Sequence, residues 1–257
     1  MEASQEMKFG KLRKFNIAMG FLHLIQGCLM LVIANDYSLP VQTTFLRFQE
    51  GVGLYQAVDD IAYLRLGPMI AMFLFVSAVA HFGVSTPGGF KWYVANLKKG
   101  INYARWYEYA ISSSIMIIVI AMLCGIYELG SLLLLFALNA TMNLFGLMME
   151  RHNQTTKKTD WTAYIFGCFA GLVPWIVIGT YFFGAVLIAG GDFPPFVIGI
   201  FISLALFFNV FAINMVLQYR KKGRWADYLH GERVYIILSL TAKSALAWQV
   251  FAGTLRG

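Results

Sequence analysis

The sequence predicts an all-α membrane protein with seven transmembrane helices. Of its 257 residues, 59% are hydrophobic and only 13% are charged, which is too little charge to cover the exterior of a soluble domain. Seven stretches stay apolar for about 20 residues, the length with which a helix crosses the hydrocarbon core of a bilayer. These stretches and short tails fill the chain, so we expect residues 1–257 to form a single domain.

The boundaries of the seven spans follow from where the apolar runs begin and end. We expect the spans at Phe15–Ala34, Gly67–Thr86, Asn102–Ile126, Leu129–Met149, Trp161–Ala189, Pro194–Tyr219 and Glu232–Leu255. The cysteines Cys28, Cys124 and Cys168 lie within these spans without metal-ligand spacing. We therefore expect no metal site and assign them to packing.

The first connection, from Asn35 to Leu66, is the only long loop that this division leaves. Val41–Phe48 alternates loosely between apolar and polar residues, and Gly51 and Gly53 follow as turn residues. A short β-hairpin outside the membrane and an irregular loop both fit this pattern.

The net charge of +7 is sorted by loop. One face of the membrane receives sixteen cations, from the N-terminal tail and the second, fourth and sixth connections: Lys8, Lys11, Arg13, Lys14, Lys91, Lys98, Lys99, Arg105, Arg151, Lys157, Lys158, Arg220, Lys221, Lys222, Arg224 and Arg233. The opposite face receives Arg47, Arg65 and Arg256. The positive-inside rule therefore predicts a cell-membrane protein with a cytoplasmic N-terminus and an extracellular C-terminus. The same sorting accounts for the charge without a nucleic-acid partner.

Four ionisable side chains lie inside the spans once the helix ends are set aside: Lys243, Glu108, His23 and His81. Lys243 lies in the middle of the last span. A lysine at this depth either pairs with a buried carboxylate, in a structural or transport role, or forms a Schiff base with a carbonyl ligand. The second role is favourable because an apolar site favours the neutral, nucleophilic amine.

Depth in the membrane links Lys243 to Glu108. Lys243 lies 11 residues after Glu232, or about 16 Å from the cytoplasmic end, and Glu108 lies 9 residues after Lys99, or about 13 Å. Helical side chains lean toward their own N-terminus, so the lysine nitrogen reaches the level of Glu108. We expect the two groups to form an ion pair.

Four stretches resemble motifs of the heliorhodopsins, a largely microbial family of retinal-binding proteins with inverted membrane topology. They are Arg105–Ser114, Phe166–Trp175, Leu229–Tyr235 and Ser239–Leu255, and the likeness covers nearly the whole chain, loop lengths included. The resemblance implies a rhodopsin-like seven-helix bundle, a homodimer, and retinal bound through Lys243, expected to be all-trans in the dark. It also implies that Glu108 is the counterion of the protonated Schiff base.

Glu108 is expected to be the single counterion. A protonated Schiff base in a low dielectric needs a nearby anion, and Glu108 is the only carboxylate deep in a predicted span. Ser239 precedes Lys243 by four residues and shares its helical face. Light-driven pumps usually carry a second carboxylate at that spacing, where this chain has a hydroxyl.

The periodicity of the third span predicts the ligand pocket. Glu108, Ser112 and Met116 recur every four residues, with Tyr109 and Ser113 alongside them. The other candidates for pocket walls are Trp175, Phe207 and Trp248. Ordinary helix packing explains any single aromatic side chain equally well.

Polar residues gather on the cytoplasmic side of Glu108. His23 lies about 15 Å deep in the first span. His81, Asn16, Ser77, Asn102 and Arg105 lie at similar depths or nearer the cytoplasmic end, which suggests a hydrated cavity. The family resemblance implies that the two histidines help to receive the Schiff-base proton, and imidazole titrates in a suitable range.

The outer halves of the spans favour light sensing over ion pumping. Ile115–Leu123, Leu132–Phe136 and Phe196–Phe201 contain no acid, base or amide, and an ion cannot cross bare hydrocarbon. We therefore predict a photoreceptor, not an enzyme, that passes its signal to a cytoplasmic partner without net ion transport. The alternatives are a light-gated proton channel or transporter and a light-dependent enzyme using Ser112–Ser114. No activated nucleophile surrounds those serines.

Overall fold

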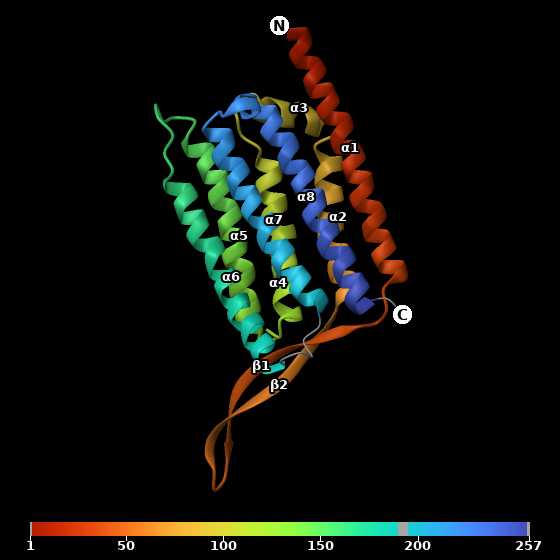
Figure 1. The fold of residues 1–257 in the computed structure, drawn as a ribbon, viewed down its shortest axis with the longest axis vertical. Helices are drawn as coiled ribbons and strands as arrows, with labels where there is room; N and C mark the ends of the chain where they lie inside the picture. The colour runs from red at the N-terminus through yellow and green to blue at the C-terminus, as the bar shows by residue number, and fades with distance from the viewer. Residues whose placement is uncertain (1, 190–194, 256–257) are drawn as a thin grey trace.

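Seven long helices form one bundle in the computed structural model, which describes residues 2–189 and 195–255 (Figure 1). They are α1 (Glu2–Ile33), α2 (Leu66–Gly83), α4 (Tyr103–Leu123), α5 (Leu129–His152), α6 (Thr162–Ala189), α7 (Pro195–Tyr219) and α8 (Tyr228–Val250), which continues as the π-helix η3 (Phe251–Leu255). All seven are long and apolar enough to cross a membrane, which confirms the seven predicted spans. Pro194, the predicted start of the sixth span, and Arg256 lie outside the described residues.

The first and last helices begin earlier than predicted. Helix α1 begins at Glu2 instead of Phe15, and α8 begins at Tyr228 instead of Glu232. Hydropathy marks where a helix enters hydrocarbon, whereas the backbone hydrogen bonds continue through polar residues into the interface. At α8 the true start is capped by Asp227, whose side chain accepts a hydrogen bond from the Leu229 N–H at 3.0 Å.

A short helix that was not predicted, α3 (Pro87–Leu97), follows α2. Pro87 occupies its first turn, and the Thr86 hydroxyl accepts a hydrogen bond from the Gly89 N–H at 3.2 Å. Only Tyr93 and Leu97 of this helix are buried. A search for membrane spans misses it because it is too short to cross. The 3₁₀ turn η2 (Gly223–Ala226) similarly joins α7 to α8.

The first connection folds into a long antiparallel hairpin of β1 (Ser38–Gln49) and β2 (Gly53–Arg65). Its turn includes Gly51 and Gly53, whose φ angles of 84° and 86° favour glycine. The Gln42 N–H donates to the Tyr127 carbonyl at 2.8 Å, which ties the hairpin to the bundle. Of the two alternatives for this connection, the hairpin is confirmed and the irregular loop is not. The strands extend well beyond Val41–Phe48.

The connections at the two ends of the bundle differ in charge. The N-terminus, α3 and the α5–α6 and α7–α8 connections lie at one end, which we call the basic end, and the hairpin lies at the other, the hairpin end (Figure 1). Arg47 and Arg65 belong to the hairpin. Arg105 is an exception among the predicted surface cations, because it is 6% exposed and lies within α4.

Helix α4 is the most enclosed of the seven. In its most apolar 18-residue window, 78% of the residues are buried, against at most 50% in the other candidate spans of the described chain. The half of α4 toward the hairpin end, Ile115–Met122, consists entirely of buried apolar residues. A charged side chain on α4 therefore has to be compensated by neighbouring helices.

The N-cap of α5 provides a test of the fold at the hairpin end. Glu128 accepts hydrogen bonds from the N–H groups of Gly130 at 2.9 Å and Ser131 at 2.6 Å, and these bonds lower its pKa. Glu128→Ala should lower the free energy of unfolding by about 1 kcal/mol at neutral pH, measured by denaturation in detergent. Because the folded-state pKa lies below the unfolded value, this contribution is complete above the unfolded pKa and is lost as pH falls through the folded pKa. Glu50→Ala, in the hairpin turn, is the matched control, and an equal loss there would contradict the capping role.

Candidate functional site

An ion pair between α8 and α4 lies at the centre of the bundle. Lys243 Nζ donates to Glu108 Oε1 at 2.9 Å, and the two side chains are 3% and 8% exposed. Lys243 also donates to Ser239 Oγ at 2.7 Å, and Ser77 Oγ donates to the same Glu108 oxygen at 2.6 Å. The structure thus brings together the lysine and the acid that were predicted to lie at equal depth.

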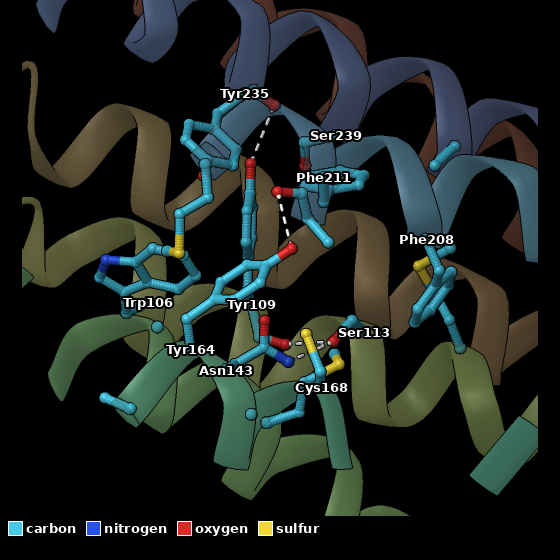
Figure 2. Close-up of a pocket in the computed structure, with 18 of the residues that line it drawn as sticks. Trp106, Tyr109, Ser113, Asn143, Tyr164, Cys168, Phe208, Phe211, Tyr235 and Ser239 are labelled. Atoms are coloured by element: carbon cyan, nitrogen blue, oxygen red, sulfur yellow. Dashed lines mark hydrogen bonds between the residues drawn. The ribbon is translucent and has the colours of Figure 1, made fainter. Parts of the chain in front are cut away.

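An apolar cavity lies between α4, α5, α6, α7 and α8 (Figure 2). Lys243 is part of its lining. The cavity is mostly apolar with a few polar groups, which is the usual composition of a site that binds a small organic ligand. Aromatic and sulfur-containing side chains dominate its lining, which includes Trp106, Met116, Met142, Tyr164, Cys168, Phe208, Phe211, Met215 and Tyr235. Of the residues predicted for the pocket, Tyr109, Ser113, Met116 and Ser239 line it.

The remaining candidates lie outside the lining of this cavity, and their contact with retinal stays a prediction. Phe208 lines the cavity instead of Phe207, because consecutive helical residues point about 100° apart. Trp175 packs behind Phe208, with ring centroids 5.4 Å apart. Trp248 is 38% exposed and donates to Gln26 of α1 at 3.1 Å. Ser112 is fully buried but lines neither this cavity nor the polar one.

Two amides of α5 that sequence analysis missed contact the cavity wall. Asn139 Nδ2 and Asn143 Nδ2 donate to Ser113 Oγ at 2.7 and 3.0 Å. Ser113 in turn donates to the Tyr109 carbonyl at 2.6 Å. The sequence did contain a signal for this contact. Two amides four residues apart in an apolar span share one helical face, which indicates a polar contact inside the bundle.

A second cavity, of about 400 Å³, lies on the other side of Glu108 and is polar. Its lining brings together Asn16, Ser77, His81, Asn102, Arg105, Glu108 and Ser239, all of them predicted site residues. His81 Nδ1 lies 2.8 Å from Asn16 Oδ1. His23 stacks on His81 with ring centroids 5.5 Å apart, and neither of its ring nitrogens has a hydrogen-bond partner in the described structure.

Sequence analysis missed a buried ion triad beyond this cavity. Arg105 forms salt bridges with Glu150 of α5 and Glu232 of α8, and all three side chains are 4% exposed or less. Both acids are close to predicted span ends, and acids at helix ends are ordinarily exposed to water. Here α3 and the α7–α8 connection lie over this end of the bundle, as Figure 1 shows, so position along the helix is a poor guide to burial.

Comparison with known proteins identifies a family. A protein-family model described as Heliorhodopsin matches residues 12–255. The matched region contains the hairpin, both cavities and the buried triad. A search of curated proteins found no match.

The triad can be compared with an exposed ion pair in the same chain. Arg105→Gln leaves two carboxylates buried without a cation and should cost about 3–5 kcal/mol of stability. Arg47→Gln removes the exposed pair between Arg47 and Asp59 of the hairpin, and such pairs contribute at most about 1 kcal/mol. Denaturation of both variants in the same detergent measures the difference. Equal effects would show that the buried triad does not hold the helices together.

Proposed function

The chain belongs to the heliorhodopsin family, and on that premise we propose that it is a photoreceptor that carries retinal on Lys243. Family membership and the seven apolar helices indicate a retinal-binding, light-responsive membrane protein. One observation supports the attachment site most directly. Lys243 is buried and lines the apolar cavity, while each of the other ten lysines is exposed.

The residues around the apolar cavity fit retinal. The lining offers aromatic faces and thioethers to a long apolar molecule, and its only amine is that of Lys243. This amine would hold retinal through a C=N bond, formed with the ligand's aldehyde by loss of one water molecule. Bound in this way, retinal supplies the absorption of visible light and a light-driven change of shape.

Glu108 holds the proton on Lys243 Nζ. A cationic nitrogen at this depth requires a nearby anion, and the Glu108 carboxylate lies 2.9 Å away. Ser77 donates to that carboxylate and favours its charged form, while Ser239 offers the nitrogen only a neutral hydroxyl. Glu108 is therefore the single counterion in this proposal.

Separation of Lys243 Nζ from Glu108 in the light releases the proton toward the polar cavity. His81 and Asn16 line that cavity, and His23 stacks on His81. Toward the hairpin end, α4 presents the apolar wall Ile115–Met122, and Gln249 pairs with Ser203 at 3.1 Å. The imidazoles that could accept the proton, those of His23 and His81, lie on the side of the polar cavity, so we propose signalling without net transport.

The distribution of charge supports an orientation and a direction for the signal. The basic end carries most of the lysines and arginines, which favours a cytoplasmic N-terminus and an extracellular hairpin. A cytoplasmic partner would then meet the basic end. The hairpin, whose exposed residues include Phe48 and Leu54, is free to contribute to a homodimer.

The lysine assignment predicts the loss of colour in one variant. Expressed with all-trans retinal, Lys243→Ala should lose the visible absorption band, because no other lysine in the described part of the chain is buried. Lys222→Ala, which removes an exposed lysine, should keep it. A visible band that survives in Lys243→Ala would place retinal elsewhere, and the absence of a band in the wild type would refute retinal binding.

The counterion assignment predicts a change of colour. Glu108→Gln should shift the visible band to longer wavelength, because loss of the anion leaves the positive charge free to spread along the polyene. Glu128→Gln, at the hairpin end, is the matched control and should leave the band in place. An unchanged band in Glu108→Gln would show that another group is the counterion.

The absence of transport is tested on illuminated cells. We expect neither a steady photocurrent nor a change of external pH, because the apolar wall of α4 closes the route toward the hairpin end. A steady current with the visible band intact would make the protein a light-gated channel or transporter.

A further inference from the structure

The buried triad is not electrically balanced if both of its glutamates are ionised. Arg105 supplies one positive charge, and Glu150 and Glu232 would supply two negative charges. Among the described residues, the salt bridges of both acids are with Arg105. Lys243, the other buried cation, is already paired with Glu108. An unbalanced charge in so enclosed a place is strongly unfavourable, and one proton would neutralise it.

The geometry favours a proton held by the pair. One guanidinium bridges the two carboxylates through different terminal nitrogens, so they lie close enough for their charges to repel. Glu150 accepts further hydrogen bonds from the Asn102 N–H at 2.9 Å, Trp106 Nε1 at 2.6 Å and Tyr228 OH at 3.0 Å. Glu232 accepts one more, from Asn102 Nδ2 at 2.7 Å.

The pair is also connected to the light-sensitive site. Glu232 lines the same polar cavity as Glu108 and His81, whereas Glu150, on α5, is not part of that lining. The other titratable groups around the triad are phenols: Tyr93 on α3, Tyr109 on α4, Tyr219 on α7, and Tyr228 and Tyr235 on α8. Phenols are neutral at neutral pH, so they do not supply the missing positive charge.

We propose that Glu150 and Glu232 share one proton in the dark, and that this proton responds when the proton of Lys243 Nζ enters the polar cavity. The response rests on the proposed function. A proton moving toward His81 brings positive charge nearer to Glu232, which weakens the hold of the pair on its own proton. Because the triad joins α4, α5 and α8, a change in its pairing alters helix contacts near the basic end.

The dark state is tested by infrared spectroscopy of protein labelled with ¹³C at the glutamate side-chain carboxyl. The wild type should show one protonated-carboxyl C=O band that moves with the label and shifts in D₂O. Glu150→Gln and Glu232→Gln should each abolish it, because the remaining acid ionises against Arg105. Glu128→Gln, which makes the same substitution at a half-buried helix cap outside the triad, should retain it. The absence of the band in the wild type, or its survival in either triad variant, would overturn the shared proton.

The light response is tested by light-minus-dark infrared spectra of the same samples. The wild type and Glu128→Gln should show a shift of the acid band, and Glu232→Gln should not. An acid band that light leaves unchanged would make the triad purely structural. The visible band of each sample shows whether retinal is bound, and so tests the proposed function. The acid band in the dark does not require retinal, so it tests the shared proton separately. If one triad variant does not fold, the other still assigns the band.

Discussion

Lys243 and Glu108 carry opposite charges in the most enclosed part of the bundle, and neither would be stable there without the other. Their contact fixes α8 against α4 at one depth and separates two different environments. On one side is a cavity of aromatic and thioether groups, and on the other is a cavity of histidine, amide and hydroxyl groups. In the proposed function, a light-absorbing ligand and a proton-accepting network therefore meet at a single nitrogen.

The polar groups are distributed unevenly along the membrane normal, and this asymmetry limits what the protein can do. From Glu108 toward the basic end, the interior contains the polar cavity and the Arg105 triad. Toward the hairpin end, α4 presents only apolar side chains from Ile115 to Met122. Charge can be rearranged within the basic half, but it meets hydrocarbon in the other direction. Such an arrangement suits a switch whose output is a change of helix contacts.

Sequence reasoning succeeded where hydropathy or depth determined the outcome. The seven spans and the Lys243–Glu108 contact follow from apolar length and from 1.5 Å of rise per residue. It failed where a distant segment decides burial. Glu150 and Glu232 look like exposed helix ends until α3 and the α7–α8 connection are placed near them. Phe208 lines the cavity in place of Phe207, because the sequence pattern does not determine how α7 is rotated about its own axis. Helix α3 was missed because its signal is a local cap, at Thr86 and Pro87, and not an apolar run.

The most direct test of the central claim is the resonance Raman spectrum of the retinal-loaded protein in H₂O and D₂O. A C=N stretch that moves to lower frequency in D₂O would show a protonated Schiff base, the charge that Glu108 is placed to stabilise. A C=N stretch insensitive to deuterium would show a neutral linkage. That result would contradict the account, because the buried Glu108 carboxylate would then have no cation to pair with.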